Sequence, residues 1–315
     1  MRGRIILLVA VGALCVGGFA VTMLLNGRGS PDAGASSNKI GSGGIAPGSY
    51  SRIVSLAPSI TELLFALGLG GNVVGRTEYC DYPPEAKSIP AVGGYLDPNY
   101  EAIVKLKPDL VLLLEEHQEA RKNLTACKLQ VFSVDHRTII GIMDSIDTIG
   151  TLCGRGQQAI KIMSDIQART GAIRKKTEPL PRRRVMVSIG RSVGVGSPKD
   201  VCIAGKEGFY DAMIDIAGGQ NVYQGSAVKF PIVSGEGIVK MNPEVIIDLV
   251  DNLDKIQGGK DALLKDWSQF GDVDAVRNGR VCVLTGSHLM RPGPRFILIV
   301  EDLAKVIHPE VDWAK

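Results

Sequence analysis

Histidine and aromatic residues are scarce in this 315-residue chain. Aromatic side chains make up 5% of it, and only two are tryptophans. The four histidines are scattered along the sequence at His117, His136, His288 and His308. No three of them accompany a carboxylate at matching strand ends, which a bound metal ion would need. The sequence therefore predicts no metal site formed by protein ligands.

Cysteine and basic residues are also too dispersed to indicate a special class. The six cysteines form no CxxC pair, and five of them lie beyond residue 25, so at most two disulfides could form there. The sequence does not determine their pairing. The formal net charge is only +3, and no basic run is interleaved with aromatic residues. We therefore expect no nucleic-acid partner.

Signatures of common catalytic sites are absent as well. The chain has no G-x-S-x-G elbow, no P-loop and no HExxH motif, and Gly190, Gly194 and Gly196 lack the spacing of G-x-G-x-x-G. The sequence therefore predicts neither an enzyme nor a resident cofactor. An extracellular α/β enzyme is the alternative from a different functional class.

The N-terminus contains the one long apolar run. After MRGR, residues 5–25 carry no charge and would span ~30 Å of hydrocarbon as a helix. Signal-peptide apolar regions are usually ~7–15 residues long, so residues 1–25 are interpreted as a transmembrane anchor rather than a cleaved signal segment. Arg2 and Arg4 would stay cytoplasmic, placing the rest outside the cytoplasm. Residues 26–50 are rich in Gly, Ser and Ala and are expected to be a flexible linker.

One phrase occurs twice in the chain. EAIVKLKPDLVLL begins at Glu101, and EGIVKMNPEVIID begins 135 residues later at Glu236. Each copy indicates a short helix, a proline that ends it and a buried strand. Solenoid repeats have periods of ~20–50 residues, so this spacing favours two copies of a domain-sized unit.

The remaining pattern predicts two α/β lobes. Residues 51–137 contain expected strands at 53–57, 110–114 and 130–134, with Ser59 and Glu62 as a capping box for the first helix. Apolar residues at helical spacing predict one long connecting helix over 138–178. Residues 179–315 contain expected strands at 185–189, 245–250 and 280–284. Each lobe is thus expected to hold a mainly parallel sheet flanked by helices.

Five stretches resemble a known family. They are RIVSLAPSITELLFALG, DYPPEA, NYEAIVKLKPDLVL, GGQNV and SGEGIVKMNPEVII, in this order. Together they resemble substrate-binding proteins of ATP-binding-cassette importers for metal chelates, the helical-backbone class of periplasmic binding proteins. DYPP and its neighbours look most like the cobalamin-binding members. The resemblance implies that the protein captures a metal chelate, with a corrinoid (cobalamin) as the favoured ligand, and delivers it to a dimeric ABC permease.

The resemblance also implies which residues bind the ligand. Family members use loops that follow the strands, and the matching candidates are Tyr79, Tyr95, Arg191, Phe230, His288 and Arg291. Aromatic rings would pack on a flat macrocycle. Alternatively, Arg76, Arg191, His288 and Arg291 would receive an anionic ferric siderophore. Neither tryptophan falls in an expected ligand loop, unlike the tryptophan-rich cobalamin sites.

Two acids match the family's docking positions. Glu101 and Glu236 begin the two repeated phrases, where family members present glutamates to arginine pockets of the permease. A pair of equivalent acids suits a two-fold partner. The alternative is that both are simply favourable residues at the start of a helix.

The anchor interpretation predicts the state of the mature N-terminus. If residues 5–25 remain as a membrane helix, N-terminal sequencing should find the protein starting at or near Met1, and it should fractionate with membranes. A mature N-terminus beyond Asn26 would contradict this and indicate a cleaved signal.

Overall fold

The computed structural model describes residues 48–193, 196, 198–251 and 253–314. The predicted anchor over residues 1–25 and most of the linker lie outside this part. Within the described residues, no helix is both long and apolar enough to cross a bilayer. Tyr50, expected to end the linker, already belongs to the folded part, because it packs on the core and its carbonyl accepts a hydrogen bond from Asn72.

The first lobe holds a four-stranded parallel sheet in the order β2-β1-β3-β4. Its strands are β1 (Ile53–Ser55), β2 (Val73–Arg76), β3 (Leu110–Leu114) and β4 (Val131–Val134). The helices are α1 (Pro58–Ala66), α2 (Tyr100–Lys105) and α3 (Gln118–Ala126), with 3₁₀ turns η2 (Gly70–Asn72) and η3 (Pro84–Ser88). All five residues of β3 are buried, as expected for a continuous apolar run inside a parallel sheet.

The second lobe holds a mixed sheet in the order β10-β9-β5-β6-β8. The strands are β5 (Arg184–Gly190), β6 (Val201–Ile203), β7 (Gln220–Asn221), β8 (Ile232–Val233), β9 (Val245–Val250) and β10 (Val281–Thr285). The helices are α6 (Phe209–Ile216), α7 (Gly235–Met241), α8 (Gly259–Trp267), α9 (Asp274–Arg277) and α10 (Phe296–Ile307), with a 3₁₀ turn η4 (Leu253–Lys255). Strands β7, β9 and β10 run parallel to their neighbours, whereas β6 and β8 pair antiparallel.

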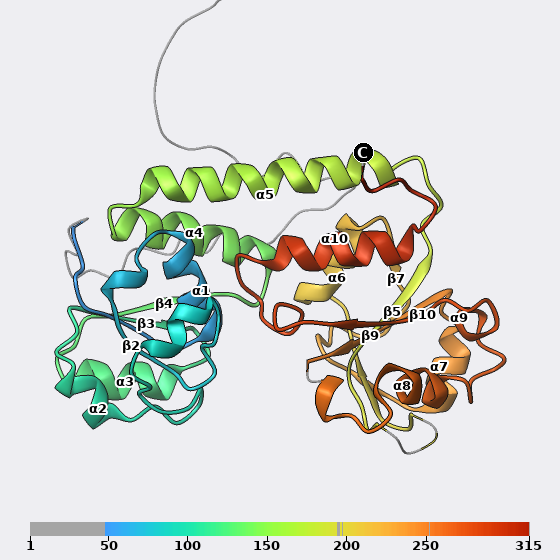
Figure 1. Cartoon of the computed structure of the whole chain (residues 1–315), viewed down its shortest axis with the longest axis horizontal. Coiled ribbons are helices and arrows are strands. Elements are labelled where there is room, and N and C mark those ends of the chain that lie inside the picture. Colours follow the sequence, from blue (N-terminus) through green and yellow to red (C-terminus); the bar gives the residue numbers. More distant parts are fainter. Residues whose placement is uncertain (1–47, 194–195, 197, 252, 315) are drawn as a thin grey trace, which may run out of the picture. The chain divides into compact units, whose positions relative to one another are not determined.

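The prediction of one connecting helix over residues 138–178 is wrong. Two helices occupy this segment, α4 (Ile139–Leu152) and α5 (Gly156–Thr177). Gly154 takes a φ of 67°, the left-handed conformation that ends a helix. A Cβ on Gly150 would lie 2.5 Å from that of Ala159, so this glycine allows α4 to pack closely on α5. Figure 1 shows α5 extending over both lobes.

The predicted capping box of α1 is also wrong, because both residues make tertiary contacts instead. Helix α1 starts after Ala57 without a side-chain cap. Ser59 Oγ lies 2.8 Å from His136 Nδ1, at the end of β4. Both carboxylate oxygens of Glu62 accept hydrogen bonds from Arg295, at 2.8 and 2.5 Å.

Ion pairs and a shared core join the two lobes. Glu62 is almost fully buried, and this burial raises its pKa although the Arg295 guanidinium opposes the shift. Arg295 also stacks over the ring of Tyr82, with 3.7 Å to the ring centre. Next to this pair, Arg291 binds Asp81, which lowers the pKa of that carboxyl group. One hydrophobic cluster continues from the first sheet through α4, α5 and α10 to the second sheet.

The repeated phrase has the same structure in both lobes. Helices α2 and α7 are capped by Asn99 and Ser234, each accepting a hydrogen bond from the backbone three residues later. A residue with positive φ follows each helix, 48° at Lys107, two residues after α2, and 42° at Asn242, directly after α7. These pairs are again 135 residues apart.

The acid that follows each proline joins the repeat to its sheet. Asp109 accepts a hydrogen bond from the backbone N–H of Arg52 at 3.0 Å, and Glu244 accepts one from that of Arg184 at 2.9 Å. Arg52 and Arg184 precede β1 and begin β5, which pair with β3 and β9. The duplication is therefore a repeated helix, turn and strand in equivalent positions of the two sheets.

Replacing Lys107 by glycine should stabilise the protein. A non-glycine residue in the left-handed region costs ~1–2 kcal/mol, of which glycine's greater unfolded-state entropy offsets ~0.5–1 kcal/mol. The free energy of unfolding in a urea titration should thus rise by about 0.5 kcal/mol or more. The matched control Lys105→Gly, inside α2, should lower it by ~1 kcal/mol. Destabilisation by both changes would argue against strain at Lys107.

The stability of the protein should fall between pH 6.5 and pH 4 because of His136. Its ring nitrogens bond Ser59 at 2.8 Å and Ser145 at 2.7 Å, and burial lowers its pKa to about 4. Between pH 6.5 and pH 4, His136 is protonated in the unfolded state but neutral in the folded state. The free energy of unfolding therefore decreases as the pH falls through this range. The contribution is on the order of 3 kcal/mol across this range. Denaturant titrations should show a smaller pH slope for His136→Asn, and an equal slope would contradict this assignment.

Candidate functional site

The loops that end the strands bring the two lobes together. In the first lobe they follow β2, β3 and β4, at residues 77–83, 115–117 and 135–138, and segment 93–98 joins them through a hydrogen bond from Glu78 to Gly93. Residues 226–231 and 286–295 of the second lobe face this set, since Arg291 pairs with Asp81 and Lys229 lowers the pKa of Asp135. We call these segments the interlobe loops. In α/β proteins, ligands bind at this edge of the sheets.

Tyr95 holds a defined position among the interlobe loops. Its hydroxyl donates a hydrogen bond to Glu116 Oε1 at 2.9 Å, and its ring meets the edge of His117 with 4.5 Å between centroids. Burial, aided by the Glu116 charge, raises the pKa of this phenol, which therefore stays neutral. The half-buried ring is fixed before any ligand arrives.

His117 is a further candidate site residue that the sequence motifs did not indicate. It is buried, and neither ring nitrogen has a hydrogen-bond partner, a situation found for no other buried side chain among the described residues. Burial lowers its pKa, so the imidazole is neutral. Its place shortly after the buried strand β3 was the signal that could have indicated it, since family members bind ligands with loops that follow the strands.

Apolar side chains are exposed on interlobe loops of both lobes. Tyr79 is 60% exposed in the first lobe, and Phe230 is 51% exposed in the second. Leu96, Val228 and the neighbouring Ile232 are exposed as well. Large apolar side chains gain free energy when a ligand covers them. The structure thus leaves both aromatic candidates available for contact.

Arg191 is committed to an internal network, which argues against the predicted ligand contact. Its side chain is 2% exposed and lies 2.8 Å from both Asp248 and Asp266. Trp267, which is fully buried, donates from Nε1 to Asp248 and lies beside the guanidinium. A buried charge removed from such partners would be strongly destabilising. We therefore remove Arg191 from the candidate ligand residues.

The other cationic candidates also have partners within the protein. Arg291 binds Asp81 and lies 3.9 Å from Glu62. Arg76 donates to the backbone carbonyls of four residues, Thr77, Glu78, Ala86 and Lys87. His288 Nε2 lies 3.2 Å from Asp302 Oδ2, and its side chain is mostly buried. Arg291 and His288 thus lie beside carboxylates, whereas the N–H groups of Arg76 are used by the backbone of the first lobe.

Carboxylates add negative charge to the same loops. Arg137 binds Glu115 and Asp135, both at 2.7 Å. The hydrogen bond to Arg137 lowers the pKa of Asp135, and the reciprocal bond raises that of Arg137. The two carboxylates offset the positive charge of Arg137, although its side chain remains 49% exposed.

The two docking candidates lie on helices that follow interlobe segments in the chain. Glu101 and Glu236 are exposed in the first turns of α2 and α7. Figure 1 shows these helices at the outer parts of the two lobes. Neither acid forms an ion pair with another described residue.

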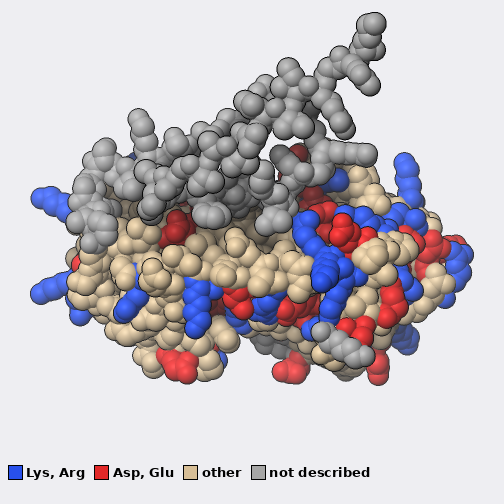
Figure 2. Space-filling view, turned by 90° about the horizontal axis from the view of Figure 1, so that it is seen from above, with Lys and Arg blue, Asp and Glu red and all other residues tan. Residues whose placement is uncertain are grey.

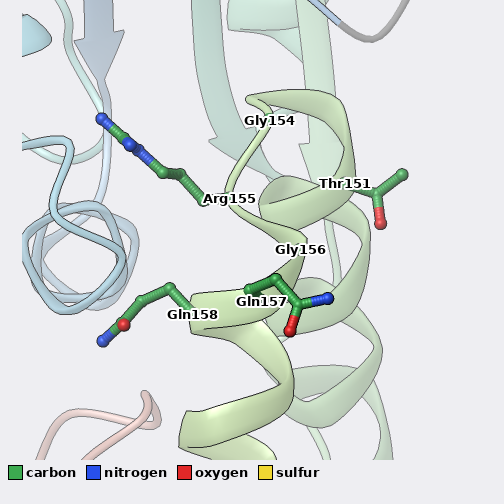
Figure 3. A pocket seen from close by; sticks show the side chains of 6 residues that line it. All are labelled: Thr151, Gly154, Arg155, Gly156, Gln157 and Gln158. Carbon is green, nitrogen blue, oxygen red and sulfur yellow. The ribbon is translucent and has the colours of Figure 1, made fainter.

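An open hollow of about 560 Å³ lies at the turn between α4 and α5. It is lined by Thr151, Gly154, Arg155, Gly156, Gln157 and Gln158, none of which is a predicted ligand residue. In Figure 3, Arg155 and Gln158 point to one side of the turn, whereas Thr151 and Gln157 point to the other. The side chains do not converge, so we assign no ligand site there.

Charges are mixed on the face shown in Figure 2. Lysine and arginine lie among aspartate and glutamate there, and no extended surface of one sign forms. Among the described residues, no group of three or more His, Cys, Asp or Glu side chains is arranged to hold a metal ion.

Comparisons with known proteins agree on one family. A periplasmic binding protein family model matches residues 53–287. An uncharacterised ABC transporter substrate-binding lipoprotein of Bacillus subtilis (strain 168) is 30% identical over 264 residues, 82% of this chain and 80% of that protein. A vitamin B12-binding protein of Photorhabdus laumondii is 26% identical over 259 residues, 82% and 88% of the two chains.

A solved structure extends this likeness to the fold. The periplasmic haem-binding protein of Roseiflexus sp. RS-1 superposes with a TM-score of 0.70 at 27% identity, covering 82% of this chain and 98% of the other. The chain therefore belongs to the periplasmic binding protein family and is a substrate-binding protein of the ABC importer type.

Proposed function

We propose that this protein acts outside the cytoplasm, captures a corrinoid such as cobalamin, and delivers it to a dimeric ABC permease. The observation that carries the proposal is the charge state of the interlobe loops. They present exposed apolar side chains, while their arginines are already paired. A ligand of this site should be broad, largely apolar and without a strong net negative charge.

The paired arginines argue against an anionic ferric siderophore, the runner-up. Such a ligand needs guanidinium groups to bind its oxygens. Arg191 is buried against two aspartates, Arg291 binds Asp81, and Arg76 binds backbone carbonyls. A corrinoid carries carboxamide side chains instead, which need hydrogen-bond partners but no cation.

The aromatic residues supply the contact that a corrin ring needs. Tyr79 and Phe230 stand exposed on opposite lobes, and the half-buried Tyr95 is oriented by Glu116. Broad apolar contact with a few polar anchors is typical of small-molecule sites. Vitamin B12-binding proteins among the relatives support the same ligand class.

Haem is a second candidate because of Tyr95 and His117. Phenolate and imidazole groups both ligate haem iron, and haem-binding proteins occur among the structural relatives. However, the Tyr95 hydroxyl keeps its proton and donates a hydrogen bond to Glu116, and its pKa is raised, so it is not a phenolate in this conformation. This favours the corrinoid over haem.

Delivery would use the two lobes together. We propose that Glu101 and Glu236 dock to the two subunits of the permease, because they occupy equivalent exposed positions on α2 and α7. Each could meet a basic group of one subunit, which steers the encounter and fixes its orientation. The predicted membrane anchor would keep the protein near its transporter. The lipoprotein among the relatives is consistent with a location outside the cytoplasm.

Alanine substitutions in the interlobe loops should weaken corrinoid binding. Cyanocobalamin should release heat on calorimetric titration, and Tyr95→Ala and Phe230→Ala should each reduce affinity by ~1–3 kcal/mol through lost ring contact. Tyr95→Phe should retain most affinity because the ring remains. Ile160→Ala, an exposed position on α5, serves as the matched control.

Two comparisons decide between the ligand classes. Binding of a ferric siderophore but of no corrinoid would reverse the ranking. The absorbance spectrum of protein purified from its native host should show corrin bands, whereas a Soret band would favour haem. Turnover of any of these chelates would instead support the enzyme alternative.

A further inference from the structure

The internal repeat allows two copies of one structural unit to be compared within the same chain. The residue is identical in both copies at five paired positions, Glu101 and Glu236, Ile103 and Ile238, Val104 and Val239, Lys105 and Lys240, and Pro108 and Pro243. The question is which of these identities the fold itself requires.

Burial explains two of the five identities. Ile103 and Ile238 are fully buried in the two lobes, where they anchor α2 and α7. Pro108 and Pro243 are buried at the turn into the next strand. Packing at close to crystal density restricts such positions. The glutamate, valine and lysine are instead exposed in both copies.

At two positions the fold tolerates different residues in the same structural role. The helix cap is Asn99 in one copy and Ser234 in the other, and the left-handed residue is Lys107 or Asn242. The residue at each of these positions differs between the two copies, but its structural role is the same. Packing therefore does not account for identity at the exposed positions, and a favourable helix start accounts only for the glutamates.

The valines are the most informative of the exposed identities. Val104 is 42% exposed and Val239 is 45% exposed. Lysine is common on surfaces, but valine is usually buried, and its branched side chain is unfavourable in a helix. An exposed valine in a helix leaves apolar surface in contact with water and has a low helix propensity. Such a valine nevertheless occurs at equivalent positions in both copies.

Each valine shares a helix face with one of the docking acids. Val104 follows Glu101 by three residues, and Val239 follows Glu236 by three, which places each pair side by side. Neither glutamate forms an ion pair with the lysine four residues later in the described structure. Each lobe therefore offers the same acid and apolar side chain together.

We propose that Val104 and Val239 are the apolar centres of two equivalent docking contacts for a two-fold permease. This rests on the proposed function. Each permease subunit would present a small apolar patch beside a basic group, complementary to the valine and the glutamate. A partner with two identical surfaces is the occupant that explains why both lobes keep the same pair. Contacts that exclude water around a charge pair also strengthen it.

The test uses the full chain and the purified permease of its own importer in nanodiscs, with affinity measured by biolayer interferometry. Val104→Ala with Val239→Ala should weaken binding at least tenfold, because two methyl groups per site lose their contact. Cyanocobalamin affinity should not change. Thermal stability should stay equal or rise, since alanine favours the helix. Ile140→Ala with Ile160→Ala, at 50% and 54% exposure, is the matched control and should bind like the wild type.

The remaining outcomes separate this inference from the proposed function. If Glu101→Ala with Glu236→Ala weakens binding but the valine variant binds like the wild type, the apolar contact is wrong and docking stands. If wild-type protein binds cyanocobalamin but not the permease, docking and the apolar contact both fail. If the valine variant instead loses a homodimer detected by sedimentation, the patches join copies of this chain, and the inference is overturned.

Discussion

The buried ion pair between Glu62 and Arg295 is the constraint on which the site depends. A carboxylate this deeply buried must be paired, since an uncompensated charge in the interior is strongly destabilising. The pair holds the segment before α10 against α1, and Arg291 reaches Asp81 beside it. The loops of both lobes are thereby kept opposite each other, while α5 and the shared core support them from behind.

Pairing within the protein also sets the chemistry that remains for a ligand. The arginines in and near the interlobe loops bind carboxylates and backbone carbonyls of the protein. Their main effect is to fix the conformation of this region rather than to bind an anionic ligand. The groups left over are aromatic and aliphatic side chains, with Tyr95 and His117 as neutral polar anchors. These apolar and neutral polar side chains are suited to a broad neutral ligand rather than to a multiply charged one.

The duplicated helix, turn and strand link the internal symmetry of the chain to the symmetry expected of its partner. Each copy is attached to its own sheet by an acid that binds the backbone of the neighbouring strand. The two copies therefore carry their exposed faces on rigid supports. Rigid support reduces the entropy lost on docking, which favours recognition of a preformed surface.

The sequence by itself determined the two-lobed α/β plan, the buried strands and the repeat, because periodicity, prolines and caps act over a few residues. Motif resemblance also made Tyr79, Tyr95 and Phe230 candidate ligand residues. Only the tertiary structure revealed that α4 ends before α5 begins and that Ser59 and Glu62 contact other elements instead of capping α1. It also showed that Arg191 is buried and that the ring nitrogens of His117 have no hydrogen-bond partner. Arg295, which binds Glu62, lies 233 residues further along the chain. Local patterns cannot identify such a partner, because folding alone brings the two charges together.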